Sequence, residues 1–238
     1  MNDCIFYYPG GTPATDHAVG ILQAAGCRFL HTPCPEITDL LLPVPCFQPD
    51  AIIGLLCQLP PGLRIFGGKL PAIYNHTVHD LLQDPLYTAQ NASITAHCAV
   101  RYAWERLPVT LQACPVLVIG WGRIGKCLAE LLRAMGADVA VAARKETDRA
   151  MLSALGYRTC PTAPLQTEGY RLIFNTAPAS LPCQCDDNCL AIDLASTPGL
   201  TGKHILHAPG LPGKLAPESS GLLIAKTILR ILKEEASK

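Results

Sequence analysis

The sequence has little charge and no excess of either sign. Only 16% of its 238 residues are charged, and 19 basic side chains balance 19 acidic ones. Proteins that bind nucleic acid usually carry a basic excess or a basic stripe, and neither is present here. We therefore expect no nucleic-acid partner, and the charge balance favours a small-molecule or protein partner.

Long apolar runs and an N-terminal targeting segment are also missing. The longest apolar runs are broken by proline, glycine or charge, whereas a membrane-spanning helix needs roughly 20 apolar residues. The first residues, Met-Asn-Asp-Cys, lack the basic stretch and following apolar stretch of a secretory signal. We expect no membrane association and a cytoplasmic location.

Cysteine, in contrast, is abundant, with 12 residues. This density is below that of a disulfide scaffold, and the chain is too long for one, so we expect reduced thiols that act mostly as small core residues. Cys183, Cys185 and Cys189 raise the possibility of a zinc site, but their spacings do not match the usual structural ligand pairs. We expect no metal site.

The first part of the chain predicts a small α/β unit. A hydrophobic fraction of 49% supports a sizeable core, and the length fits one large domain or two small ones. Short apolar runs alternate with helical patterns and turn residues, which is typical of a parallel α/β fold. Over residues 1–88 we expect strands at Cys4–Tyr8, Cys27–Leu30, Asp39–Leu42 and Leu63–Phe66, and helices at His17–Ala25 and Ala51–Leu59.

A connecting helix and a second α/β unit follow. Within residues 89–111, Ala92–Leu107 has apolar residues at helical spacing, and Pro108 ends the pattern. Residues 216–238 predict a terminal helix, with Pro217 near its start. Between them we expect strands at Val116–Ile119, Asp138–Ala143, Leu172–Asn175, Leu190–Leu194 and His204–His207, and helices at Arg123–Met135 and Asp148–Leu155.

A glycine-rich turn is the most informative motif. Gly120-Trp121-Gly122-Arg123-Ile124-Gly125 follows an apolar strand and opens a helix, which is the context that a dinucleotide-binding turn requires. The glycines permit the tight turn, the approach of the backbone to a pyrophosphate and close packing of helix on strand. The helix N-terminus attracts the anion. All six residues are therefore candidate cofactor ligands.

The end of the next strand bears on the choice of cofactor. An NAD site usually has Asp or Glu there, whereas this strand ends in Arg144 and Lys145. A guanidinium can bind a 2′-phosphate through two hydrogen bonds, and lysine adds a point charge. The pattern favours NADP. NAD stays possible, because a small shift of the boundary would put Glu146 at the ribose.

Two further strand ends face the same edge if the sheet is doubly wound. One strand ends in Asn175, Thr176, Ala177 and Pro178, and the other ends in Asp193, Leu194, Ala195 and Ser196, of which Leu194 and Ser196 are candidate ligands. Amide and hydroxyl groups there could bond the nicotinamide ribose or carboxamide. Ordinary turn chemistry explains the same residues equally well, since these residue types favour turns.

Five stretches occur together in an order that is typical of one family: Val118–Lys126, Ala142–Lys145, Asn175–Pro178, Ile192–Gly199 and Ala208–Pro217. Across them the sequence resembles the larger, A-type subunit of dipicolinate synthase from spore-forming bacteria. The resemblance implies a two-domain α/β protein related in shape to D-2-hydroxyacid dehydrogenases. Its parts would be an N-terminal flavodoxin-like domain (1–88), a linking helix (89–111), a Rossmann NAD(P)-binding domain with a doubly wound parallel sheet (112–215), and a terminal helix (216–238) returning to the first domain.

The resemblance also implies an activity. The family is held to oxidise a dihydrodipicolinate-level intermediate to dipicolinate during sporulation, with NADP or NAD as hydride acceptor. It works with the smaller, B-type subunit of dipicolinate synthase, and we expect a homo-oligomer. A dicarboxylate substrate needs cations or helix N-termini, so Arg101, Lys214, Ser219 and Ser220 are candidate substrate ligands. His97, His207 and Lys214 are the candidate catalytic residues, the histidines because they titrate in the useful range.

Three departures from the family pattern leave alternatives open. Thr12-Pro13-Ala14 stands where the family usually has Asp-Ala-Arg, and His97-Cys98 stands where it tends to have Glu-Gly. The segment between Ser196 and Ala208 is shorter than usual. These departures keep open a non-catalytic NADP-binding partner or sensor with a degenerate substrate site. An ordinary 2-hydroxyacid dehydrogenase is disfavoured, because its usual Arg, Glu and His series is missing from the expected strand ends.

Overall fold

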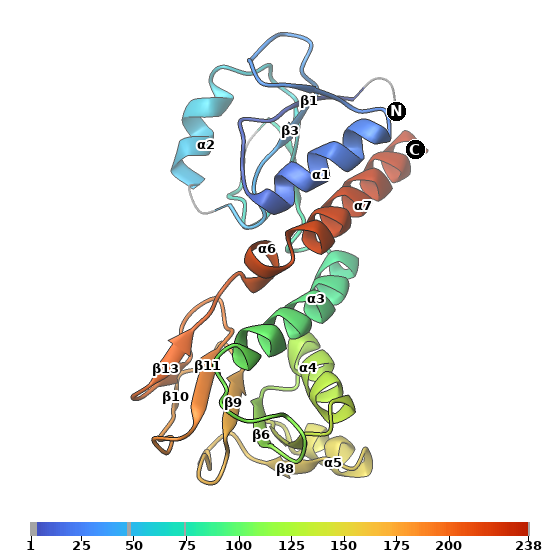
Figure 1. Cartoon of the computed structure of the whole chain (residues 1–238). Helices are drawn as coiled ribbons and strands as arrows, with labels where there is room; N and C mark the ends of the chain where they lie inside the picture. The colour runs from blue at the N-terminus through green and yellow to red at the C-terminus, as the bar shows by residue number, and fades with distance from the viewer. Residues whose placement is uncertain (1–3, 47–48, 74, 238) are drawn as a thin grey trace. The chain divides into compact units, whose positions relative to one another are not determined.

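The computed structural model describes residues 4–46, 49–73 and 75–237. The chain is an α/β protein with two parallel sheets, and it divides into two compact units (Figure 1). The first unit comprises Met1–Asn91 and Pro212–Lys238, and the second comprises Ala92–Leu211. The predicted fold class is confirmed. In the described part of the chain, no helix combines the length and the apolar character needed to cross a membrane.

The first unit contains a five-stranded parallel sheet. Along the sheet the strands are β2 (Arg28–Leu30), β1 (Ile5–Tyr7), β3 (Asp39–Leu41), β4 (Arg64–Gly67) and β5 (Thr77–Asp80). This order is the one found in flavodoxin-like sheets. Its helices are α1 (Pro13–Ala24), α2 (Pro49–Leu56) and α7 (Pro217–Ala236), and α7 packs along α1 (Figure 1).

Helix α1 begins earlier than the expected start at His17, because Thr12 caps it. The Thr12 hydroxyl accepts the Thr15 N–H, and the Thr15 hydroxyl accepts the Thr12 N–H at 2.7 Å, so the two threonines form a reciprocal capping box. Pro13 occupies the first helical turn, where its missing N–H costs no hydrogen bond. The Thr12-Pro13-Ala14 departure from the family pattern therefore serves as a helix start.

A buried ion pair lies at the beginning of two neighbouring strands of this unit. Asp39 is fully buried, and Arg64 donates to both of its carboxylate oxygens, from Nε at 2.7 Å and from Nη2 at 2.8 Å. Arg64 Nη1 also lies 3.5 Å from Glu235 Oε2, near the end of α7. The pair thus ties α7 to the sheet at the edge where the strands begin, which is the edge opposite to their carboxyl ends.

The second unit contains a six-stranded parallel sheet. Along the sheet the strands are β13 (Ile205–His207), β11 (Leu190–Asp193), β9 (Leu172–Asn175), β6 (Pro115–Ile119), β7 (Asp138–Ala142) and β8 (Arg158–Cys160). When these six strands are numbered along the chain from β6 and read from the β8 side, their order is 3-2-1-4-5-6. This is the order of the dinucleotide-binding fold. A separate two-stranded ladder joins β10 (Leu181–Pro182) to β12 (Leu200–Thr201).

Helices α4 (Arg123–Ala134) and α5 (Glu146–Ala154) follow β6 and β7. Two further helices contain residues of both units. Helix α3 (Pro85–Trp104) lies where we expected a linking helix over 89–111. The short helix α6 (Leu211–Leu215) was not expected. Asp84 starts α3 by accepting the Tyr87 N–H at 2.8 Å, which explains why the helix begins before residue 89.

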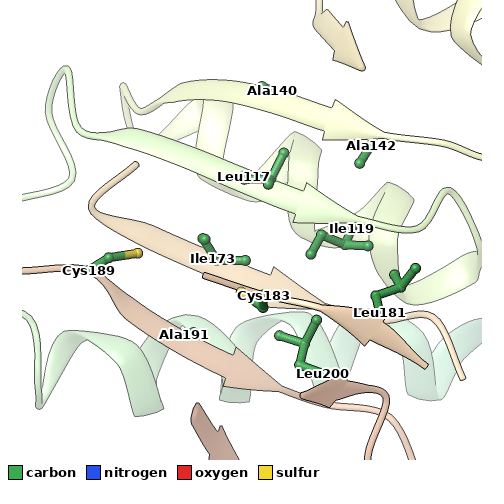
Figure 2. Packing of buried hydrophobic residues seen from close by; sticks show 10 residues of the cluster. All are labelled: Leu117, Ile119, Ala140, Ala142, Ile173, Leu181, Cys183, Cys189, Ala191 and Leu200. Carbon is green, nitrogen blue, oxygen red and sulfur yellow. The ribbon is translucent and has the colours of Figure 1, made fainter. Parts of the chain in front are cut away.

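Both faces of this sheet are buried, since alternate residues such as Val118 and Phe174 are 0% exposed as well, and one apolar cluster fills the face away from them. Alternate residues of the central strands point to this face, and the β10–β12 ladder covers them (Figure 2). Cys183 and Cys189 are buried in the same cluster. Its members are Leu117, Ile119, Ala140, Ala142, Ile173, Leu181, Cys183, Cys189, Ala191 and Leu200. The strands carrying the candidate cofactor residues are therefore anchored in a continuous apolar core.

Candidate functional site

The glycine turn joins β6 to α4 at the carboxyl edge of the second sheet. Gly120 has φ +103°, a conformation that side chains rarely adopt. A Cβ on Gly125 would lie 2.1 Å from the Gly120 carbonyl oxygen, so only glycine lets the helix pack this close to the strand. A Cβ on Gly122 would meet no atom within 4 Å. The first and third glycines are thus required by the fold, whereas the second leaves open space beside the turn.

The start of α4 is suited to an anion. Its N-cap, Gly122, supplies no side-chain hydrogen bond, and its first turn has no acidic residue. The first N–H groups of a helix have no intrahelical partner and carry the positive end of the helix dipole. Arg123 is exposed beside them. The open space at Gly122 therefore fits a pyrophosphate that would accept these N–H groups.

Trp121 and Ile124 belong to the same turn but are half-buried. The Trp121 ring meets the Tyr157 ring edge to face, with 5.9 Å between the ring centroids. The Lys126 ammonium lies 5.7 Å from the centroid of the Trp121 ring. These contacts orient the Trp121 side chain, so the turn offers a ligand mainly its backbone.

Two exposed cations stand at the end of β7. Ala143 is buried, whereas Arg144 and Lys145 are exposed, and Lys145 is the N-cap of α5. Within the described residues neither cation is ion-paired to a carboxylate. Glu146 lies in the first turn of α5 and is also exposed. The side chains that bear on NADP or NAD binding are thus all accessible to solvent.

Arg149 holds the backbone beneath these cations. Its Nη1 donates to the carbonyl oxygens of Ala143 and Arg144, both at 2.9 Å. Sequence reasoning did not single out this residue, which is the fourth residue of α5 and belongs to no motif. Arg149 therefore fixes the turn from which Arg144 projects.

Asn175 closes the end of β9 with bonds inside the protein. Its side chain is fully buried; Nδ2 donates to Asp193 Oδ1 and to the Ala177 carbonyl, both at 2.9 Å, and Oδ1 accepts the Ala177 N–H at 3.0 Å. The Thr176 hydroxyl donates to the Ile119 carbonyl at 2.9 Å. The polar side chains that were candidate cofactor ligands here thus bond the protein itself.

Asp193, at the end of β11, organises the neighbouring loop. It is fully buried and accepts the Ala195, Gly199 and Leu200 N–H groups at 3.0, 2.6 and 2.9 Å. Leu194 is buried and Ser196 is exposed. The sequence placed Asp193 at this strand end but gave its carboxylate no role as a ligand, and the structure shows that the carboxylate holds the loop.

These strand ends lie side by side at one edge of the sheet. Ile119 is in register with Asn175, Asn175 with Asp193, and Asp193 with His207. Because the strands are parallel, their carboxyl ends all meet there, which is where ligands bind in open α/β sheets. The glycine turn, Asn175–Pro178, Leu194–Ser196 and His207 are therefore brought together within the second unit.

His207 is exposed, and its Nε2 lies 2.9 Å from the Ala195 carbonyl oxygen. A carbonyl oxygen only accepts, so Nε2 carries the proton and Nδ1 is the nitrogen left to take one. The bond also orients the ring against the loop after β11. Of the two candidate histidines, His207 is the one at the edge with the glycine turn.

His97 and Arg101 lie elsewhere in the second unit. They line a shallow groove of about 390 Å³ together with Leu131 and Met135, at the far end of α4 from the glycine turn. The groove is completed by Val100, Trp104 and Glu105, and Arg101 Nε is 3.5 Å from Glu105 Oε1. The structure does not bring His97 or Arg101 to the glycine turn.

Lys214, Ser219 and Ser220 belong to the first unit, around the start of α7. Lys214 and Ser219 are exposed. Ser220 is only 4% exposed, and its hydroxyl has no hydrogen-bond partner among the described residues. The N-cap of α7, Ala216, supplies no side-chain hydrogen bond. This helix start thus has capacity for an acceptor group.

The described residues contain no group of three histidine, cysteine or acidic side chains arranged to hold a metal ion. The candidate site consists of helix-start N–H groups and exposed cations, both of which suit an anionic ligand.

No protein-family model matches the sequence. The chain is 26% identical to the A-type subunit of dipicolinate synthase of Bacillus subtilis (strain 168) over 262 aligned residues, which cover 95% of this chain and 88% of that protein. The crystal structure of the corresponding dipicolinate synthase subunit from Bacillus halodurans superposes with a TM-score of 0.82 at 20% identity, covering 98% of each chain.

A D-isomer specific 2-hydroxyacid dehydrogenase from Xanthobacter autotrophicus Py2 shares the fold more distantly. Its TM-score is 0.57 at 16% identity, with 100% of this chain and 98% of that chain covered. The expected resemblance is therefore confirmed. The sequence is similar to that of the A-type subunit of dipicolinate synthase over nearly its whole length. The chain also has the two-unit fold that this subunit shares with D-2-hydroxyacid dehydrogenases.

Proposed function

We propose that the protein is an NADP-dependent oxidoreductase that corresponds to the A-type subunit of dipicolinate synthase. It would oxidise a dihydrodipicolinate-level intermediate to dipicolinate. The observation that carries the proposal is the glycine turn with its open space at Gly122, followed along the sheet by the exposed cations Arg144 and Lys145. The similarity to dipicolinate synthase supplies the substrate class.

The residues present fit a phosphorylated dinucleotide. The N–H groups at the start of α4 would receive the pyrophosphate, with Arg123 beside it. Arg144 would bind the 2′-phosphate through two charge-assisted hydrogen bonds, and Lys145 would add a second positive charge. Arg149 would keep Arg144 in place, because it holds the carbonyl groups at the turn. The bound cofactor would supply the hydride acceptor for the oxidation.

His207 is the base that we propose. Forming an aromatic ring from a dihydro ring requires loss of a proton as well as a hydride, and histidine titrates near neutral pH. Its Nδ1 is the available nitrogen, since Nε2 bonds Ala195. The backbone of Asn175–Pro178 and Leu194–Ser196 would shape the space beside it, because the Asn175 and Thr176 side chains already bond the protein.

The start of α7 would serve the dicarboxylate substrate. Ser219 and the uncapped N–H groups of the first turn would donate to a carboxylate, and Lys214 would contribute a positive charge, whereas the Ser220 hydroxyl is buried. The B-type subunit of dipicolinate synthase would be the protein partner, and the protein would act in the cytoplasm during sporulation as a homo-oligomer. These assignments rest on the similarity to dipicolinate synthase.

The alternative is a nucleotide-binding partner or sensor that performs no reaction. The specific observation in its favour is that His97 and Arg101, candidates for the reaction, lie at the far end of α4 from the glycine turn. The departure from the family pattern at His97 agrees with this alternative.

The test is a coupled reaction. The purified protein is mixed with a dihydrodipicolinate-generating reaction and NADP, with and without the B-type subunit, and reduced-cofactor absorbance is followed. The proposal predicts that reduced-cofactor absorbance increases only when this protein is present. It should not increase with the Gly122→Asp variant, which places a carboxylate in the open space at the turn. Tight NADP binding without turnover under both conditions would favour the non-catalytic alternative, and absence of NADP binding would refute both.

A further inference from the structure

A cluster of three thiols lies in the second unit, away from the residues assigned above. Cys183 Sγ and Cys185 Sγ are 3.0 Å apart, and Cys185 packs against the buried cluster that contains both Cys183 and Cys189. Cys183 and Cys189 are buried in the core that Figure 2 shows, whereas Cys185 is partly exposed. Cys185 thus contacts the Cys183 thiol and is the one of the three that solvent reaches.

The two buried thiols stay protonated at neutral pH. Burial and the contact with Cys185 raise the pKa of the Cys183 thiol to about 12, and burial together with the neighbouring Cys185 raises the pKa of the Cys189 thiol to about 12. The Cys183 thiol can therefore direct its S–H group at the Cys185 sulfur. Since an oxidant must reach the sulfur that it attacks, Cys185 is the accessible nucleophile of the three.

The backbone between Cys183 and Cys185 is held in place. The buried Thr167 hydroxyl donates to the Gln184 carbonyl oxygen at 2.5 Å, and the Cys183 N–H donates to the Thr201 carbonyl at 2.9 Å. A disulfide bond is about 2.05 Å long, so joining the two sulfurs requires an approach of about 1 Å. Such a displacement must move the segment on which Cys183 lies.

That segment is linked by hydrogen bonds to the candidate nucleotide site. Cys183 follows β10, whose Leu181 N–H donates to the Gly199 carbonyl at 2.7 Å. The Gly199 N–H in turn donates to Asp193, which also accepts from Asn175. The chain of bonds from the thiols to the strand ends is therefore continuous and lies within the second unit.

We propose that Cys183 and Cys185 form a dithiol that a peroxide oxidises to a reversible disulfide, and that this disulfide weakens nucleotide binding at the ends of β9 and β11. The second half of this inference rests on the proposed cofactor site, whereas the first half does not. The oxidant is a peroxide, because a small uncharged molecule can reach the partly exposed Cys185 sulfur.

The chemistry proceeds in two balanced steps. The Cys185 sulfur attacks hydrogen peroxide; an S–O bond forms, the O–O bond breaks, and one water leaves, giving a sulfenic acid. The Cys183 sulfur then attacks the Cys185 sulfur; the S–S bond forms, the S–O bond breaks, and the hydroxyl leaves as water with the Cys183 proton. Both sulfurs are oxidised, and both peroxide oxygens are reduced to water.

Mass spectrometry tests the disulfide directly. Trypsin leaves all three cysteines on one peptide, residues 172–203, because Arg171 and Lys203 flank it. After brief treatment of the full-length protein with hydrogen peroxide, this peptide should lose two hydrogen atoms, with fragment ions joining Cys183 to Cys185, and dithiothreitol should restore its mass. The exposed Cys57 provides an internal reference for oxidation of an accessible thiol.

Two variants sharpen the result. Cys183→Ser should form no disulfide and should accumulate a sulfenic acid at Cys185, which a cyclic diketone reagent captures. Cys160→Ser is the matched control, because Cys160 packs against the same cluster and should leave the disulfide unaffected. A disulfide to Cys189 in the wild type, or oxidation of Cys185 no faster than that of Cys57, would overturn the assignment.

Nucleotide binding tests the coupling. The oxidised wild type should bind NADP at least about fivefold more weakly than the reduced protein, at the lower end of common coupling energies, and dithiothreitol should restore binding. Equal affinity of the oxidised and reduced forms, with the disulfide present, would refute the coupling. If the reduced protein itself does not bind NADP, the proposed function fails, while the peptide masses still decide whether the dithiol exists.

Discussion

The Asn175 side chain donates from Nδ2 to Oδ1 of Asp193 at 2.9 Å, and both residues are fully buried at the ends of adjacent strands. The pair links β9 to β11 and, through the N–H groups that Asp193 accepts, fixes the loop up to Leu200. Two residue types that often bind ligands therefore work here as a structural connection, and the surface left for a nucleotide is largely backbone.

This relationship predicts a large loss of stability in Asp193→Ala. Removing the carboxylate leaves the buried Gly199 and Leu200 N–H groups without their acceptor, and each unsatisfied buried group costs about 1–3 kcal/mol. We expect a decrease of about 3 kcal/mol or more in the free energy of unfolding, measured by urea denaturation. Ser196→Ala, an exposed change in the same loop, is the control, and a similar small effect for both variants would contradict the interpretation.

The second and third glycines of the turn should respond differently to the same substitution. Gly125→Ala puts a methyl group 2.1 Å from the Gly120 carbonyl, so we expect a decrease of about 1–3 kcal/mol in unfolding free energy. Gly122→Ala meets no atom within 4 Å and should change stability by less than about 0.5 kcal/mol.

The Gly122→Ala variant also separates an effect on binding from an effect on folding. If the pyrophosphate occupies the space beside Gly122, Gly122→Ala should lose most of its NADP affinity while its thermal unfolding is unchanged. Calorimetric titration and melting curves measure the two quantities. Unaltered NADP binding by Gly122→Ala would show that the phosphate lies elsewhere.

Arg144→Ala should reduce the preference for NADP over NAD. Loss of the charge-assisted bonds to a 2′-phosphate is expected to cost about 1–3 kcal/mol in NADP binding and to leave NAD binding nearly unchanged. Arg158→Ala is a suitable control, because Arg158 is paired with Asp138 where β7 and β8 begin, at the opposite edge of the sheet. Equal affinity of the wild type for both cofactors would exclude the role of Arg144.

His207→Gln should lower the turnover rate without lowering NADP affinity. A glutamine amide nitrogen takes the place of the imidazole Nε2 and can still donate to the Ala195 carbonyl, but the amide cannot take up a proton near neutral pH. We expect a 10²–10⁴-fold decrease in kcat, roughly what one general base contributes. Undiminished turnover by the variant would assign the proton transfer to another group.

The ionised Asp84 carboxylate should stabilise the folded first unit at neutral pH, and this stabilisation should be lost in acid. Burial alone would raise the pKa of Asp84, but the Tyr87 N–H and the Arg230 guanidinium outweigh it and lower the pKa below the ordinary 3.8. A carboxyl whose pKa is lower in the folded state contributes stability above its unfolded pKa. That contribution is lost as the pH falls through the folded pKa.

Melting temperatures from pH 7 down to pH 2 check this expectation. Asp84→Asn should lose stability at neutral pH and should show a flatter decline on acidification than the wild type. Asp138→Asn, which removes an exposed carboxylate paired with Arg158, is the comparison and should change the slope little. Parallel curves for the wild type and Asp84→Asn would contradict the role of the Asp84 contact.

The local pattern of the sequence determined most of the secondary structure in the second unit. The apolar run Val116–Ile119, the glycines and the helical spacing after Arg123 act over a few residues, so they are visible without the fold. Polar edge strands were not visible: β5 contains Thr77, His79 and Asp80, and only its pairing with β4 makes it a strand. The two-residue strands β10 and β12 are defined in the same way by their mutual pairing.

For the candidate site, the sequence determined the glycine turn and the cations that follow β7, because both depend on residues adjacent in the chain. Only the tertiary structure decided that Asn175 bonds Asp193, that His207 rather than His97 lies at the edge with the glycine turn, and that Cys183 touches Cys185. Hydrogen bonding and burial decide these points. Both depend on strand register and on which face of a helix is covered, and spacing along the chain specifies neither.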